Sequence, residues 1–407
     1  MWTKMKAKDI MELRKRFKKD CSVTRVAGCY VDSNKEQVLT FSLPFMSLDD
    51  VEGLKYLEIA KKTLSGSLGN NILELDFEMI EEQEDGMQKL LYDIKESGLK
   101  DDALLQKLYT RIIDKYNYPD NYLILLFHDR YDILKKTSDG QTLDESEEVY
   151  EYILGAICPV ALSKPGLGYI PGENRIGAVV RERVVEVPQI GFLFPAFDER
   201  SADIHKVDYY VKDVKDGESD FAEEVLGCIS RRTAFQQRSV FTGIVKSAYK
   251  NDSDKFDDMI MEIQDSFNIR VEEKKNEGEL EAEKPIFLDE GLMNEILEEN
   301  KVDEDVAKDI IKGIKDEFVS EAPTVNDLVD TRAVKAYAPK KREKELVREV
   351  IELKNQIEQP QYDVAVRVAP DKADRVRAEI VETELYLMIP MEGSEHVSVN
   401  GVERAFD

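Results

Sequence analysis

The chain has 407 residues, a length typical of two or three domains. Its 57 Lys and Arg residues against 84 Asp and Glu residues give a formal net charge of −27, which repels phosphate backbones and anionic lipid at long range. Hydrophobic residues make up 42% of the chain, which is enough for a core, so we expect most of it to fold. General nucleic-acid binding is disfavoured except where basic residues cluster.

No apolar stretch reaches the roughly 18 residues that a membrane span needs, and residues 1–20 lack the apolar segment of a secretory signal. The four cysteines are too few for a disulfide scaffold. Cys21 and Cys29 flank a β-type run of about 26 Å, which is beyond disulfide reach. These features predict a cytoplasmic protein with free, buried thiols.

Residues 6–19 have helical apolar spacing with a strongly basic opposite face, and they predict an amphipathic helix. Two β-type runs, 22–32 and 36–45, then predict a hairpin. Ser47 and Asp50 form a capping-box pattern that predicts the start of the next helix.

The middle of the chain mixes helical and β patterns. Apolar periodicity predicts helices at 87–94 and 105–116. Runs of β-branched, aromatic or consecutive apolar residues predict strands at 122–127, 152–162, 184–197 and 207–211. The fold class expected is α+β or α/β, with a mixed sheet and flanking helices in the N-terminal two-thirds, then a helical segment and a small C-terminal β-containing module.

The patterns also predict a division of the chain into consecutive parts. The dense mixed charge of residues 271–285 is typical of a linker. The expected parts are an α/β-type main domain (1–230), a helical extension (231–270), the charged linker (271–285), a helical segment (286–360) and a small β-rich module (361–407).

Histidine, the usual general base and metal ligand, is scarce here, with three in the chain. His128 follows an apolar run and stands close to Asp129 and Asp132, and His205 lies in a second acidic neighbourhood. If they meet in space, these four residues could form a metal site or an acid/base pair. The alternative, which we favour, is two polar strand ends with local turn hydrogen bonds.

Residues 163–177 form a Gly/Pro-rich stretch whose backbone N–H groups could bind an anion. An ordinary structural loop is the alternative that we favour, because such residues commonly mark turns. The candidate ligand-binding residues are Lys164, Gly166, Gly168, Arg200 and Asp203.

Two basic clusters interrupt the acidic background, one in the first helix and one at 339–344. They could contact RNA or an acidic partner, or they could form solvated faces that pair with the chain's own carboxylates, which we favour. The candidate partner-binding residues of the first cluster are Arg14, Lys15, Arg16, Lys18 and Lys19.

Four blocks, CSVTRVAGCYVD, KKTLSG, EVYEYILGAICPVALSKPGLGY and GFLFPAFDERSADIH, resemble a bacterial protein family labelled domain of unknown function 4317. The resemblance spans nearly the whole chain, although residues 270–345 carry little of it. It implies a cytosolic bacterial protein, chiefly of Gram-positive anaerobes, and it transfers no catalytic residues.

The sequence favours a non-catalytic macromolecule-binding or regulatory protein, with a protein or ribonucleoprotein as the partner. Two alternatives stay open. One is a metal-assisted hydrolase of a phosphorylated or nucleotide substrate, in which Lys164 or Arg200 holds the anion. The other is an RNA- or ribosome-associated factor. The sequence identifies no cofactor and no oligomeric state.

Overall fold

A computed structural model describes residues 7–83, 85–136, 142–178, 180–198, 201–250, 252–276, 285–319, 322–358, 368, 370–391, 397–399 and 402–404. The chain forms two compact units, Met1–Lys335 and Ala336–Asp407. Among the described residues, no helix is both long and apolar enough to cross a bilayer.

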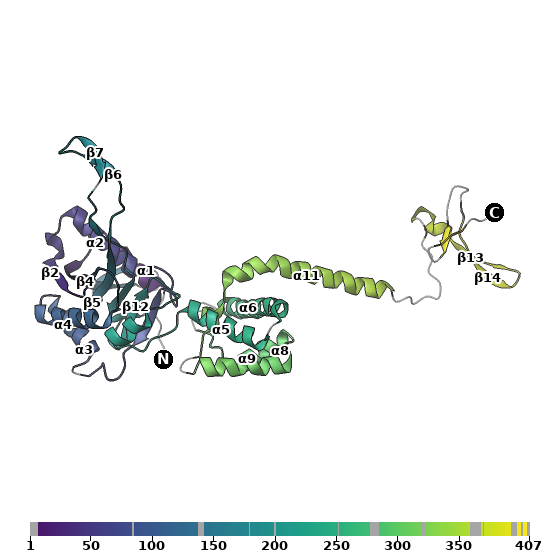
Figure 1. Ribbon diagram of the computed structural model, residues 1–407. Coiled ribbons are helices and arrows are strands. Elements are labelled where there is room, and N and C mark those ends of the chain that lie inside the picture. The colour runs from purple at the N-terminus through teal and green to yellow at the C-terminus, as the bar shows by residue number, and fades with distance from the viewer. Residues whose placement is uncertain are drawn as a thin grey trace. The chain divides into compact units, whose positions relative to one another are not determined.

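The first unit is built on an eight-stranded sheet (Figure 1). Its strand order is β2-β1-β4-β5-β9-β12-β3, and β8 pairs with the end of β5. The registered pairs in this sheet are antiparallel, so of the two expected fold classes the structure has α+β. The strands are β1 (Val23–Val31), β2 (Gln37–Pro44), β3 (Ile72–Asp76), β4 (Tyr122–Lys136), β5 (Thr142–Leu162), β8 (Arg183–Val185), β9 (Ile190–Phe194) and β12 (Lys206–Val211).

Helices cover both faces of this sheet because its central strands are apolar on both faces. Along β4, Ile124 and Leu126 enter one core, whereas Leu125 and Phe127 enter the other. Helices α3 (Met87–Ser97) and α4 (Asp102–Lys115) and the π-helical turn η2 (Phe221–Val225) pack in the first core; α1 (Ala7–Arg16), the 3-10 turn η1 (Phe45–Ser47) and α2 (Asp50–Thr63) pack in the second. The predicted flanking helices are thereby confirmed.

The predicted capping box at the start of α2 is wrong in detail. The N-cap residue is Asp49, whose carboxylate accepts hydrogen bonds from the backbone N–H groups of Val51 and Glu52. The Ser47 hydroxyl instead donates to the carbonyl oxygen of Pro44. The chain enters the helix two residues later than the pattern predicts because Phe45–Ser47 forms a 3-10 turn of its own.

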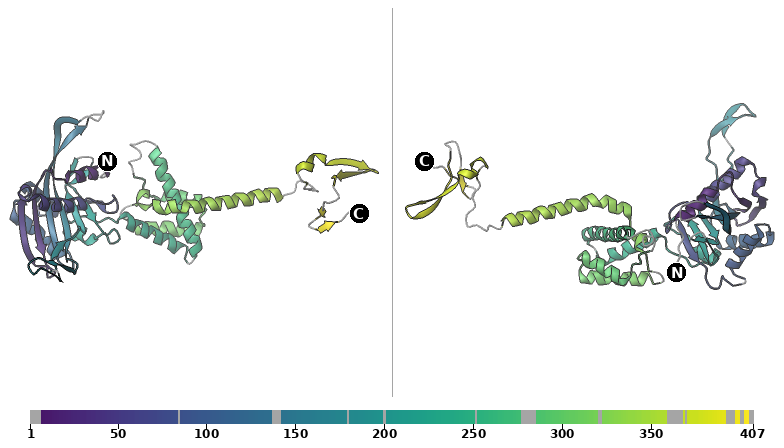
Figure 2. Two further views of the ribbon diagram at one scale, coloured as in Figure 1. Left: turned by 90° about the horizontal axis from the view of Figure 1, so that it is seen from above. Right: turned by 180° about the vertical axis from the view of Figure 1, so that it is seen from behind.

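The Gly/Pro-rich stretch at 163–177 is not a plain loop. It forms most of an antiparallel ribbon, β6 (Leu167–Ile170) paired with β7 (Arg175–Ala178). This ribbon stands out from the main sheet in each view (Figure 1, Figure 2). A second short ribbon, β10 (Ala196–Asp198) with β11 (Ser201–Asp203), follows the cis Phe194–Pro195 bond.

The rest of the first unit is helical and has its own core. Phe241 and Phe267 lie at its centre, 5.4 Å apart between ring centroids. Thr233 caps the first of these helices in a reciprocal capping box with Gln236. The helices are α5 (Ala234–Ala248), α6 (Ser253–Asn276), α8 (Glu290–Glu299), α9 (Glu304–Glu317) and α10 (Val325–Leu328).

Helix α11 (Thr331–Glu358) runs from the end of the first unit into the second. The second unit also contains the expected small β module. Its elements are η3 (Pro370–Arg375), β13 (Arg377–Val381), β14 (Glu384–Met388), β15 (Val397–Val399) and β16 (Val402–Arg404), and the strands form two antiparallel pairs. The finer division of the chain into five parts stays a prediction. Of the predicted linker, residues 271–276 belong to α6 and 277–284 lie outside the described residues.

Candidate functional site

His128 lies at the centre of a three-residue cluster contributed by β1, β4 and β5, which we call the histidine cluster: Thr24, His128 and Glu151. Strand β1 pairs Val23 with Asp129 but Arg25 with His128, so Thr24 is an extra residue in a β-bulge. Bulges redirect side chains and are frequent beside functional sites. Here the bulge directs the Thr24 hydroxyl at the imidazole.

The imidazole is hydrogen-bonded on both nitrogens. His128 Nδ1 lies 2.6 Å from Thr24 Oγ1, and His128 Nε2 lies 2.9 Å from Glu151 Oε1. Burial lowers the pKa of His128 below its usual 6.5, although the Glu151 carboxylate opposes that shift. A neutral imidazole has one donor and one acceptor, and the carboxylate can only accept. Nε2–H therefore donates to Glu151, and Nδ1 accepts from the Thr24 hydroxyl.

This order of hydroxyl, imidazole and carboxylate is the arrangement by which a base activates a nucleophile. Thr24 is exposed, whereas His128 is buried. Sequence reasoning found His128 but missed Thr24 and Glu151. The pairing of β1 and β5 with β4 brings them together, and no local pattern around either residue indicates it.

Asp129 does not belong to this cluster, because adjacent strand residues point to opposite faces. Its Oδ2 accepts a 2.6 Å hydrogen bond from the Tyr152 hydroxyl and lies 3.6 Å from the Arg16 guanidinium. Its Oδ1 is buried without a hydrogen-bond partner among the described residues. Arg16 also stacks over the Tyr131 ring, 3.8 Å from the centroid. Asp129 and Arg16 thus tie α1 to the sheet.

His205 is remote from His128. It precedes β12, three strands from β4 in the sheet, which corresponds to about 14 Å at usual strand spacing. His205 Nδ1 contacts Glu82 Oε1 at 2.9 Å on the surface. Asp132 is exposed farther along β4. Over the part of the chain that the structure describes, no three His, Cys, Asp or Glu residues are grouped as metal ligands would be.

The candidate ligand-binding residues do not converge either. Lys164 and Gly166 are exposed before β6, and a side chain added at Gly166 would meet no atom within 4 Å. Gly168 lies within β6. Asp203 Oδ1 accepts from the His205 backbone N–H at 2.9 Å, which holds the turn after β11. Arg200 lies outside the described residues.

The five basic residues around α1 differ in their surroundings. Arg16 is turned inward, and Lys19 is 2.6 Å from Asp50 on the surface. Lys15 and Lys18 are exposed. Arg14 faces an open groove of about 730 Å³ that α2 and β8 border, where the acidic residues Glu52, Glu58 and Glu186 lie among Lys55, Lys61 and Lys62.

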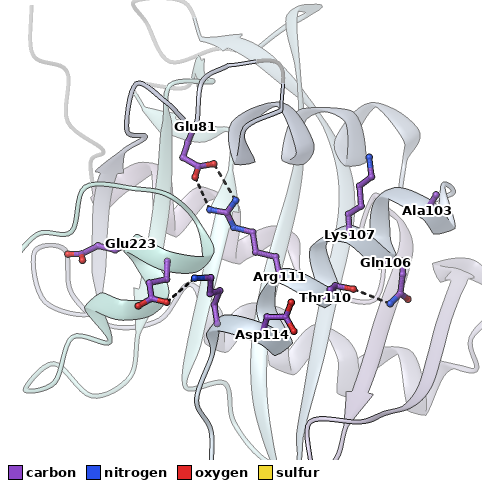
Figure 3. A pocket seen from close by; sticks show the side chains of 10 residues that line it. Glu81, Ala103, Gln106, Lys107, Thr110, Arg111, Asp114 and Glu223 are labelled. Carbon is purple, nitrogen blue, oxygen red and sulfur yellow. Dashed lines mark hydrogen bonds and ion pairs between the residues drawn. The ribbon is translucent and has the colours of Figure 1, made fainter.

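A second hollow, of about 850 Å³, lies beside α4 (Figure 3). Arg111 is paired with Glu81 at 2.9 Å, and Lys115 lies 3.5 Å from Glu224. The Glu81 carboxylate also accepts from the Met87 backbone N–H at the start of α3. These pairs join α4 to its neighbours, and the mixed charge favours neither anionic nor cationic ligands.

Together these features define an α+β protein whose large antiparallel sheet carries a buried, hydrogen-bonded histidine and precedes a helical bundle. The chain belongs to the family described as domain of unknown function (DUF4317), whose sequence profile matches residues 5–402. The predicted resemblance is thereby confirmed. No curated protein matches the chain.

Proposed function

We propose that this is a non-catalytic binding protein that contacts another protein through the ribbon β6–β7. The observation that carries the proposal is the exposed apolar face of this ribbon. Tyr169 pairs with Ile176 and Leu167 with Ala178, so their side chains share one face. Leu167 is 77% exposed, Tyr169 59% and Ile176 64%.

Large apolar side chains that lie next to one another and are exposed are typical of contact surfaces. A two-stranded ribbon is marginally stable in water by itself, so covering its apolar face would stabilise it. Polar residues adjoin the ends of the ribbon, including Lys164 before β6 and Glu173 in the turn before β7, as in the rim of an interface. The Tyr169 ring is the best candidate for the main anchor, because Tyr is enriched among residues that dominate binding.

Co-purification from the native cell with a variant pair tests the proposal. Leu167→Ser with Ile176→Ser should remove most of a specific, stoichiometric partner without changing the thermal midpoint. Val38→Ser with Leu39→Ser, on the exposed edge strand β2, is the matched control, since these side chains are similarly exposed. Equal recovery of the partner with both variant pairs would contradict the proposal.

The histidine cluster supports a second candidate function, hydrolysis of a phosphorylated substrate. Thr24 Oγ1 would attack phosphorus and transfer its proton to His128 Nδ1. The imidazolium would then protonate the departing alcohol, and water would release phosphate from Thr24.

Release of p-nitrophenol from p-nitrophenyl phosphate, assayed with and without divalent metal, tests this second candidate function. Thr24→Ala should abolish turnover, whereas Thr40→Ala on β2 should not.

The RNA- or ribosome-associated alternative has less support. Of the five basic residues near α1, Arg16 and Lys19 are engaged by Asp129 and Asp50. If this alternative holds, binding to ribosomes should fall steeply with added salt.

A further inference from the structure

The second half of α11 carries an exposed apolar stripe. Leu346 is 45% exposed, Val350 49% and Leu353 50%. They are separated by four and then three residues, and Ile357 continues that spacing in the sequence. This 3.5-residue average is the repeat of a coiled-coil seam.

We propose that α11 forms a parallel, two-stranded coiled coil with a second copy of this chain. In heptad positions, Val350 and Ile357 occupy a, and Leu346 and Leu353 occupy d. β-Branched residues at a with leucine at d favour parallel dimers over higher oligomers. The residue types at a and d therefore favour two strands.

The charges beside the seam fit the same arrangement. Glu349 occupies position g and Lys354 occupies the following position e, and both lie in the exposed part of the helix. In a parallel dimer, g of one helix faces e of the next heptad on the other, so Glu349 meets Lys354 of the second copy. The two-fold symmetry forms this pair twice. In an antiparallel dimer g faces g, and the pair is lost.

The heptad pattern stops at both ends of this short seam. The preceding a position holds Glu343 and the d position before it Pro339, and Pro360 follows the helix. Ile351, at position b, lies outside the seam. A seam of four side chains per helix buries little area, so we expect a reversible dimer whose population rises with protein concentration.

Sedimentation equilibrium of the full chain tests the proposal. The wild-type mass should rise with concentration from 46.7 kDa toward twice that value and no higher. Glu349→Lys and Lys354→Glu should each weaken the dimer by about tenfold, and the double variant should restore it. Glu352→Lys, at the outward position c, makes the same charge change and should have no effect.

Disulfide trapping tests the direction of the helices. Val350→Cys should cross-link readily on oxidation because parallel a positions face each other, whereas Glu352→Cys should not. Three outcomes would overturn the proposal: a monomer at every concentration, which would mean that another segment or protein covers the stripe; a trimer; or a dimer in which the double variant is not restored.

Discussion

His128 Nδ1 lies 2.6 Å from Thr24 Oγ1 because a bulge in β1 turns the Thr24 side chain toward β4. Glu151, on β5, holds the other imidazole nitrogen at 2.9 Å. Three strands therefore fix one buried, neutral imidazole, and its protonation is linked to the stability of the sheet.

We expect His128 to make unfolding pH-dependent. Its pKa is lower in the folded than in the unfolded state, so its contribution to stability is complete above about pH 6.5 and is lost as the pH falls through the folded pKa. Glu151 opposes this shift, as does Asp129, whereas the Lys95 ammonium reinforces it. Urea unfolding between about pH 7.5 and 5.5 should show a smaller stability loss for His128→Gln than for the wild type. An equal loss of stability in His128→Gln and in the wild type would disprove this linkage. His205→Gln, which changes an exposed histidine, is the control.

Asp208 should give the stability of the fold the opposite pH dependence. Burial raises its pKa well above 3.8, with the Asp198 carboxylate adding to the shift. The stability associated with the protonated form is therefore complete below about pH 3.8 and is lost as the pH rises. Asp208→Asn cannot ionise, and its Oδ1 can still accept from the Phe197 N–H as Asp208 does at 2.9 Å. We expect its stability relative to the wild type to increase between about pH 5 and 8; a constant difference in urea midpoints would refute this.

Tyr152→Phe should destabilise the fold by about 2 kcal/mol, because it removes the hydroxyl that donates to the buried Asp129 carboxylate. Tyr169→Phe removes a hydroxyl bonded to Asn174 on the exposed ribbon, and it should change the free energy of unfolding by less than about 0.5 kcal/mol. Chemical denaturation measures both. Equal effects would show that the buried hydrogen bond contributes little.

Two glycine substitutions should change the stability of the fold in opposite directions. A Cβ at Gly191 would lie 2.1 Å from Thr63 Cγ2 and 2.8 Å from the Gly155 carbonyl oxygen, so Gly191→Ala should cost about 2 kcal/mol or more. A Cβ at Gly243, exposed within α5, would meet no atom within 4 Å. Gly243→Ala should stabilise by about 0.5–1 kcal/mol through helix propensity. The thermal midpoints of the two variants give the comparison. A lower midpoint than that of the wild type for both variants would contradict the expectation.

Local patterns predicted many, but not all, of the elements of this fold. The apolar run in β4 and the helical spacing of α3 and α4 each correspond to observed elements. The 163–177 ribbon was missed because its short strands contain glycine and are bounded by turn residues, which are more common in loops. Its exposed face makes no core contact that an apolar pattern could reveal.

The candidate site was predicted only in part. The apolar run before His128 is visible in the sequence, but the expectation that His128 lies at a strand end was wrong, because β4 continues to Lys136. Thr24 lies 104 residues from His128, and Glu151 lies 23 residues from it. Strand register brings the three together, and one bulge decides which way Thr24 points. The proximity of His128 to Asp129 in sequence was misleading, because strand alternation separates them onto opposite faces of the sheet.

Site-specific photo-crosslinking in the native cell tests the proposed binding function most directly. A photoreactive residue replaces Tyr169 on the ribbon or, as the matched control, Leu39 on β2, which is similarly exposed. The proposal predicts one dominant cross-linked protein at position 169, absent at position 39 and lost when Leu167 and Ile176 are both changed to Ser. Cross-links of equal yield at both positions, or none at position 169, would contradict it.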